Sequence, residues 1–91
     1  MRWSVRTQGL VWKRVGGQVV VLDLASSTYF STGESGALLW DRLCDGASED
    51  ELVLILESAY GLARQTAVDD VRGFLSDGAE AGILSSEDPP E

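Results

Sequence analysis

The side chains that could do covalent chemistry are few in this chain of 91 residues. It has no histidine, which is both the usual general base at neutral pH and the commonest transition-metal ligand in proteins. Its one cysteine, Cys44, cannot form a disulfide within the chain. Because Cys44 stands in an apolar helical pattern, we expect a buried structural thiol rather than a reactive one. The sequence therefore argues against an enzyme, and we expect no catalytic residue, metal or cofactor.

Charge is spread unevenly along the chain, whose formal net charge is −8. Residues 1–22 carry basic side chains and no acid, whereas residues 23–91 carry all 15 acids. A nucleic-acid surface needs dense cations to displace the counterions of phosphates, so no nucleic-acid partner is expected. The acids either keep a small domain soluble or attract a basic partner, and the sequence leaves both interpretations open.

The sequence predicts one compact domain in the cytoplasm. Apolar residues make up 44% of the chain, close to the average for globular proteins. No apolar run approaches the roughly 18 to 20 residues of a membrane span. The first six residues contain neither a long apolar stretch nor a small-residue cleavage site, so they do not resemble a secretory signal.

The first half of the domain has the pattern of three short strands. Residues 10–15 and 18–24 are apolar and rich in β-branched side chains, and Gly16-Gly17 between them predicts a tight hairpin. Residues 28–32 predict a third strand. We therefore expect an antiparallel meander.

Alternation along the second strand divides it into two faces. Val20, Leu22 and Leu24 share one face, which we expect to pack on the core. Val19 and Val21 lie on the opposite face, which is expected to point outward with a tryptophan as partial cover.

The second half predicts three helices, and the first two have clear ends. The first covers residues 36–44 and stops at Gly46, which tolerates a left-handed cap conformation. Ser48 and Glu51 have the spacing of a capping box at the start of the second helix. Gly61 is expected to end that helix.

The third helix and the tail complete the chain. Thr66 is expected to cap the third helix, which runs to about Ala81. The acidic residues 85–91, which include two prolines, are predicted to be a disordered tail. Residues 1–84 would then form the folded domain.

The ordered set of these segments resembles a known family. The residues that carry the resemblance are Val20-Val21-Leu22-Asp23-Leu24 with Thr28-Tyr29-Phe30, Gly36-Ala37 with Trp40 and Leu43, Ser48 to Leu52 with Tyr60-Gly61, and Asp70-Val71 with Phe74-Leu75 and Gly82-Ile83-Leu84. In this order they are similar to the PqqD-like leader-peptide recognition elements of pathways that modify ribosomally synthesised peptides (RiPPs). Within that family the chain is most similar to the stand-alone leader-binding subunit of lasso-peptide maturation systems.

The resemblance implies both a fold and a function. It implies an α+β fold like a winged helix-turn-helix, with a three-stranded antiparallel sheet followed by three helices. It implies that the leader peptide of a precursor binds as an added strand along the third strand, against the third helix. It also implies a separate partner, the leader peptidase that removes the leader.

Physical reasoning suggests which residues would do this. The edge of a terminal strand offers unpaired main-chain groups, and an apolar helical stripe beside it would read side chains. Either Tyr29 or Phe30 must point inward, and the sequence leaves open which one meets the peptide. The expected peptide-binding residues are Leu24, Thr28, Tyr29, Phe30, Ser31, Thr32, Val68, Asp69, Val71, Arg72 and Leu75.

Three other functions compete with this one. A DNA-binding winged helix is possible by fold alone, but the acidic third helix opposes it. A carrier protein would attach its prosthetic group at a serine such as Ser35, but the predicted strands do not suit that all-helical class. The same fold delivering a different RiPP precursor, to a radical SAM enzyme or a cyclodehydratase, remains open.

Gly78 stands where family members usually carry leucine, which would either loosen the third helix or open a pocket beside it.

Overall fold

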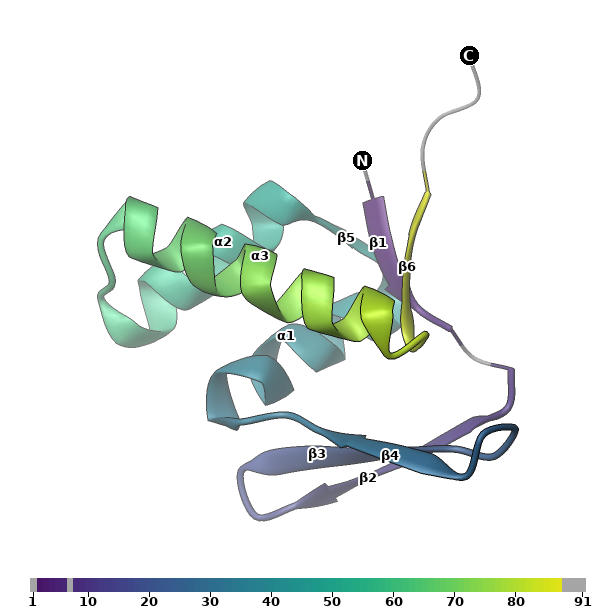
Figure 1. Ribbon diagram of the computed structural model, residues 1–91. Helices are drawn as coiled ribbons and strands as arrows, with labels where there is room; N and C mark the ends of the chain where they lie inside the picture. The colour runs from purple at the N-terminus through teal and green to yellow at the C-terminus, as the bar shows by residue number, and fades with distance from the viewer. Residues whose placement is uncertain (1, 7, 88–91) are drawn as a thin grey trace.

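The structure is a computed structural model that describes residues 2–6 and 8–87. Its elements in chain order are β1 (Arg2–Val5), β2 (Leu10–Val15), β3 (Gln18–Asp23), β4 (Thr28–Ser31), α1 (Glu34–Asp45), β5 (Ala47–Ser48), α2 (Glu49–Tyr60), α3 (Arg64–Glu80) and β6 (Leu84–Glu87). The expected α+β class is confirmed. Figure 1 shows the helices on one side of the β2–β3–β4 sheet, with β1 and β6 side by side at one end of them.

The β2–β3–β4 sheet is the antiparallel meander that the sequence predicted. Val15 and Gln18 face each other across the first hairpin, so Gly16 and Gly17 alone make the turn. Gly16 has a φ of 62°, which glycine adopts without a steric cost. Local turn chemistry therefore fixes the register of the first two strands.

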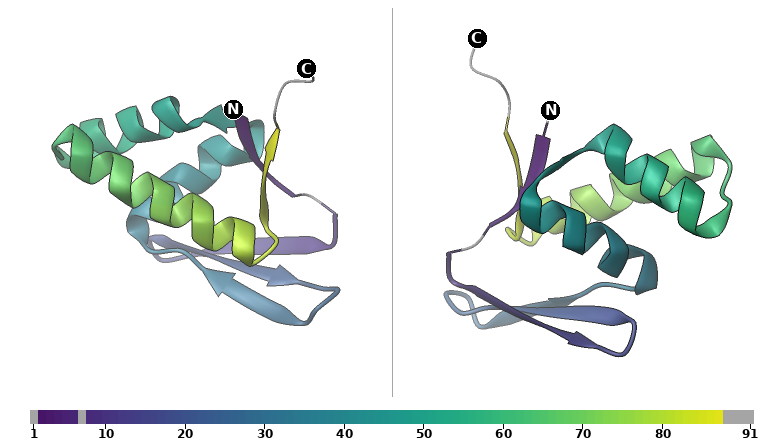
Figure 2. Two further views of the ribbon diagram at one scale, coloured as in Figure 1. Left: turned by 45° about the horizontal axis from the view of Figure 1, so that its top comes forward. Right: turned by 180° about the vertical axis from the view of Figure 1, so that it is seen from behind.

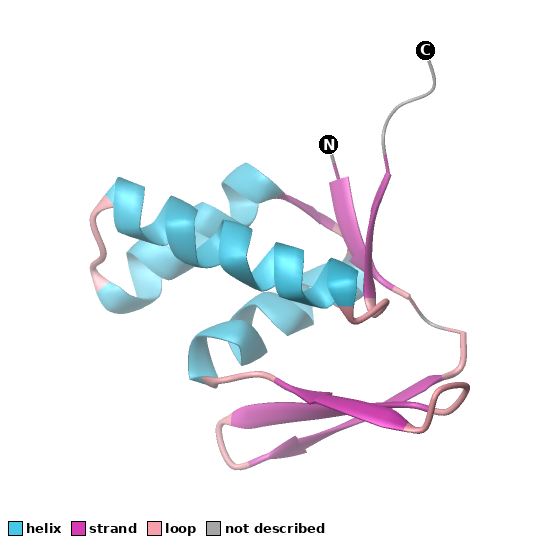
Figure 3. Cartoon of the chain, viewed as in Figure 1, coloured by secondary structure: helices cyan, strands magenta, loops and turns pink. Residues whose placement is uncertain are grey.

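The two faces of this sheet are the reverse of the expected ones. Val19 and Val21 are buried beneath the helices, whereas Leu22 and Leu24 are exposed. The reason is the short link from β4 to α1, which lays the helices on the Val19 side. The strands of this sheet are the magenta ones in the lower part of Figure 3, and we call the side of the sheet that faces away from the helices the outer face. By the strand register its residues are Val11, Lys13, Val15, Gln18, Val20, Leu22, Tyr29 and Ser31.

A second antiparallel sheet, in the order β5–β1–β6, was not predicted. Arg2 pairs with Ser48 on one side and with Glu87 on the other. The expectation of disorder is wrong for residues 85–87, because their main chain pairs with β1. Residues 88–91 of the predicted tail lie outside the described residues.

The helix starts agree with the sequence in one case and differ in another. Ser48 caps α2 as predicted, since its hydroxyl accepts a hydrogen bond from the amide of Glu51 at 3.2 Å. Gly61 ends α2 in the left-handed conformation. Thr66 does not cap α3, which begins at Arg64 after an extended Ala63 that makes no side-chain cap bond.

Gly78 lies where α3 touches β6. A Cβ atom at this position would come within 2.3 Å of Leu84 Cδ1, so only glycine fits against Leu84. The expected pocket beside this glycine is not formed, because Leu84 fills the space and is itself buried.

Cys44 is exposed, and the expectation of a buried thiol is wrong. The buried stripe of α1 passes through Leu39, Trp40 and Leu43, so Cys44 falls just past it. Partial burial raises the pKa of its thiol, and the carboxylates of Asp41 and Asp45 raise it further. A raised pKa disfavours the reactive thiolate at neutral pH. Within the described residues, no helix combines the length and the apolar character that a bilayer crossing requires.

Candidate functional site

Strand β4 forms an open edge of the β2–β3–β4 sheet. It is the last strand in the sheet order, and β1 pairs with β5 and β6 instead. Within the described residues no segment pairs along its outer side, and the views in Figure 2 agree. An unpaired strand edge offers a row of N–H and C=O groups to another chain.

The pairing of β4 shows which main-chain groups face outward. The amide of Thr32 donates to the carbonyl of Val19 at 2.9 Å. Successive residues of a strand direct their main-chain groups to opposite sides, so Phe30 bonds toward β3. Tyr29 and Ser31 therefore present their N–H and C=O groups at the open edge.

A hollow of about 250 Å³ lies between β4 and the end of α3. We call it the β4–α3 hollow, and its lining residues are Val21, Asp23, Thr28, Tyr29, Phe30, Ala81 and Ile83. Val21 and Ile83 are buried in the core, so they form a firm apolar base. A mostly apolar concave surface with a few polar groups is typical of a binding site.

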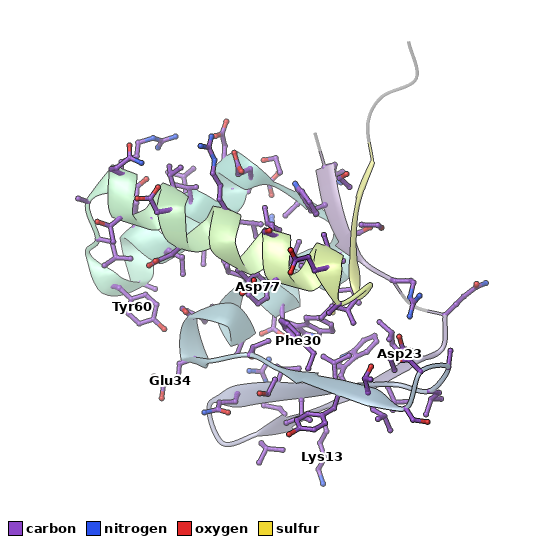
Figure 4. The ribbon with its side chains drawn as sticks, viewed as in Figure 1. Lys13, Asp23, Phe30, Glu34, Tyr60 and Asp77 are labelled. Atoms are coloured by element: carbon purple, nitrogen blue, oxygen red, sulfur yellow. The ribbon has the colours of Figure 1, made fainter. Side chains whose placement is uncertain are left out.

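The flank of α3 that faces β4 carries Phe74, Asp77 and Ala81. These residues are spaced at i, i+3 and i+7, which places them on one side of a helix. The ring of Phe74 meets that of Phe30 edge to face, with the ring centroids 6.4 Å apart. Figure 4 shows Phe30 pointing from the sheet toward α3, with Asp77 close by on that helix.

The end of α3 completes the hollow. Gly82 takes a φ of 77°, and the amide of Ile83 turns back to donate to the carbonyl of Gly78 at 3.0 Å. The carbonyl of Ile83 in turn accepts from the amide of Arg6 at 2.9 Å. These bonds hold Ile83 in place beneath β4.

Asp23 is the charged group of the β4–α3 hollow. Its carboxylate accepts hydrogen bonds from Arg6 and from the amide of Ala25, each at 3.0 Å. Burial alone would raise the pKa of Asp23, but the bond from Ala25 and the charge of Arg6 outweigh it. The pKa of Asp23 therefore lies below its ordinary value, and the group stays ionised and paired at neutral pH.

The structure brings together four of the predicted residues along β4. Thr28, Tyr29 and Phe30 line the β4–α3 hollow, and Ser31 lies at the open edge. The two aromatic residues of the pair point to opposite faces of the sheet. Phe30 points inward, whereas Tyr29 belongs to the outer face and is 75% exposed.

Three other predicted residues are buried in the core. The hydroxyl of Thr32 accepts from the amide of Val19 at 3.0 Å, so its side chain closes the sheet. Val71 and Leu75 are 0% and 2% exposed. The apolar stripe on α3 therefore holds the helix to the domain, and Val71 and Leu75 offer a bound chain almost no surface.

The remaining predicted residues are three on α3, which lie away from β4, and Leu24 in the turn that joins β3 to β4. Val68 and Arg72 share the opposite flank of α3, and Asp69 bonds to Gln65 on the helix surface. Arg72 pairs with Glu49 at 3.4 Å. It lines a different hollow, of about 410 Å³, near β1. Leu24 is exposed in the turn after β3.

Sequence reasoning missed five residues of the site. They are Val21, Asp23, Phe74, Ala81 and Ile83, with the last two at the end of α3. The spacing of Phe74, Asp77 and Ala81 was a usable signal, because it marks a helix flank that is neither fully apolar nor fully charged.

Comparison with known proteins identifies the family. The family model described as "Coenzyme PQQ synthesis protein D (PqqD)" matches residues 18–84, about three quarters of the chain. The chain belongs to the PqqD family. This membership confirms the resemblance that the sequence motifs suggested, and the match takes in β3, β4, all three helices and the start of β6.

Two solved structures resemble this PqqD-family chain over nearly its whole length. One is "TbiB1 in Complex with the TbiA(beta) Leader Peptide", with 27% identity and a TM-score of 0.82 over 94% of this chain and 99% of that one. The other is "Lasso peptide synthetase B1 complexed with the leader peptide", with 25% identity and a TM-score of 0.80 over 92% and 98%. No curated protein matches the chain closely enough to count as a relative.

Proposed function

We propose that this chain binds the leader peptide of a ribosomally synthesised precursor as an added strand on β4. The observation that carries the proposal is an open strand edge lying beside an apolar hollow in one domain. The two similar structures support it, because each is a complex with a leader peptide.

The geometry suggests how affinity and selectivity arise. Main-chain bonds to Tyr29 and Ser31 would hold any extended peptide, since they read no side chain. Every second side chain of that peptide would point inward over Phe30, Ala81 and Ile83. We therefore expect the bound leader to place apolar side chains at these inward positions.

The further role that we propose is presentation of the leader to a separate leader peptidase in the cytoplasm. The second similar structure is described as lasso peptide synthetase B1, which supports a lasso-type precursor. The chain has no histidine and one cysteine with a raised pKa, so we propose that the chemistry belongs to the partner.

A second candidate is delivery of another RiPP precursor to another modifying enzyme, such as a radical SAM enzyme. The family's description supports it, because it refers to coenzyme PQQ synthesis rather than to lasso peptides. Binding assays with leaders of both precursor types would decide between the two, because a site shaped for one leader should bind the other more weakly.

The test of strand addition uses a leader peptide that this chain binds, sought among the precursor peptides of the same organism. Methylating a peptide amide removes its N–H, so methylation at residues that bond to Tyr29 or Ser31 should weaken binding about tenfold or more. Methylation at the intervening residues is the control and should have a much smaller effect. Equal effects at both sets of positions in a fluorescence anisotropy titration would rule out a paired strand.

A further inference from the structure

The outer face of the β2–β3–β4 sheet is mostly apolar, and no described element covers it. Val11 and Val15 are about half exposed, and Leu22 beside them is 38% exposed. Figures 1 and 2 show every described helix on the other side of the sheet. A hollow of about 360 Å³ lies among Val11, Trp12, Lys13, Val15, Val20 and Leu22. Contiguous exposed apolar surface of this kind marks an interaction site in a soluble protein.

The outer face adjoins the proposed peptide site. Tyr29 stands directly opposite Leu22 in the register of β3 and β4. A peptide added along β4 would extend the sheet, so every second peptide side chain would lie in line with Tyr29 and Leu22. A protein that covers the outer face would therefore touch the bound peptide as well.

Charge indicates what kind of partner fits. Lys13 is the only lysine of the chain, and Figure 4 shows it pointing away from the helices. It makes no ion pair with a carboxylate in the described part of the chain, whereas Arg14 beside it pairs with Asp41 at 2.6 Å. The outer face itself carries no acid. Its complement is an apolar surface bordered by carboxylates.

A second copy of the chain fits this face poorly. A symmetric pair would set the Lys13 side chains of both copies near each other with no acid to separate them. The net charge of −8 on each copy adds a general repulsion between the two domains.

We propose that the outer face docks the enzyme that acts on the bound peptide, through an apolar surface bordered by carboxylates on that enzyme. This inference rests on the proposed function and adds the surface through which the partner is held. The enzyme then contacts both the sheet and the peptide, so peptide and enzyme should strengthen each other's binding.

The test measures binding of a leader peptidase from the same organism, with an inactivated active site, in the presence and absence of the leader. Val15→Glu should raise the dissociation constant for the peptidase about tenfold or more, because it buries an unmatched charge. The same variant should bind the leader alone within about twofold of the wild type. Lys13→Glu should slow association and reverse its salt dependence.

The matched control is Leu54→Glu on α2, which lies away from this sheet. Leu54 is 55% exposed and Val15 is 54% exposed, so the two changes alter similar amounts of surface. The control should bind both peptidase and leader as the wild type does. Circular dichroism of each variant checks that the fold is kept.

The other outcomes would overturn the inference in distinguishable ways. Equal peptidase affinity for Val15→Glu and the wild type would place the docking surface elsewhere. A wild-type chain that binds the leader but no peptidase at about 100 µM would remove the docking role and leave the proposed function intact. Sedimentation that shows a dimer dissociated by Val15→Glu, with peptidase affinity unchanged, would make a second copy the occupant. A chain that binds no leader at all would overturn the proposed function first.

Discussion

The inner and outer faces of the β2–β3–β4 sheet are both apolar, yet only one is buried. Val21 is completely buried, while its neighbour Leu22 is 38% exposed. The difference comes from the junction of β4 and α1, where Gly36 packs so closely that a Cβ would lie within 2.9 Å of Thr32 and Phe74. The comparison teaches that the chain connection, rather than the apolar pattern, selects the face that becomes core.

The largest expected effect separates the two faces by stability. Val21→Asp places a charge in the core and should cost about 3 to 5 kcal/mol of unfolding free energy. Leu22→Asp places the same charge on the outer face and should cost about 1 kcal/mol. Urea titrations followed by circular dichroism measure both. Similar losses for the two variants would contradict the assignment of the faces.

The next effect separates the faces by binding of the leader. Phe30→Ala removes an inward ring of the β4–α3 hollow and should weaken leader binding about tenfold, or about 1.4 kcal/mol. Tyr29→Ala removes an outward ring and should change the affinity of the leader about twofold. Phe30→Leu keeps most of the volume and should lie between them. If anisotropy showed that Tyr29→Ala loses more leader affinity than Phe30→Ala, the binding site would lie on the outer face.

A smaller effect concerns charge on the two sides of the sheet. Asp77 stands on the flank of α3 beside the β4–α3 hollow, and Lys13 stands on the outer face. For a basic leader, raising salt from about 50 to about 500 mM should weaken binding a few-fold. Asp77→Asn should reduce that salt dependence, whereas Lys13→Gln should leave it unchanged. An unchanged dissociation constant across this range of salt would remove the electrostatic contribution.

The smallest effect is a pH dependence that belongs to the inner face alone. The pKa of Asp23 is lower in the folded chain than its ordinary value of 3.8. The ionised group thus stabilises the fold above about pH 4, and this contribution is lost as the pH falls through the lowered pKa. Asp23→Asn should reduce the fall of the urea unfolding midpoint as the pH is lowered below about 4. Asp69→Asn, on the surface of α3, is the control and should keep it.

Local signals predicted most of the fold. The hairpin at Gly16 and the cap at Ser48 each depend on residues a few positions apart, and both were found from the sequence. The β5–β1–β6 sheet was missed because β1 and β6 lie at opposite ends of the chain. Each of these two strands is four residues of mixed polarity with no turn signal beside it, so its sequence alone does not predict a strand. It becomes a strand only by pairing with a distant part of the chain.

The candidate site was predicted on β4 and misplaced on α3. The open edge follows from β4 being the last strand of a meander, which the sequence shows. On α3, the sequence favours the most apolar stripe as the contact surface, but Val71 and Leu75 hold the helix to the core. The flank that faces β4 combines Phe74 with Asp77, because a helix between core and solvent has a mixed border.

The pairing of Arg2 with Glu87 has a consequence for engineering. Residues opposite each other in an antiparallel ladder have Cα atoms about 5 Å apart, so a short glycine-serine bridge could join Glu87 to Arg2 in a chain cut back to these residues. New ends could then be opened at the Gly16-Gly17 turn, giving a circular permutant that keeps every strand of both sheets. A cargo or reporter attached there would sit at the end of β2 and β3 rather than along the open edge of β4.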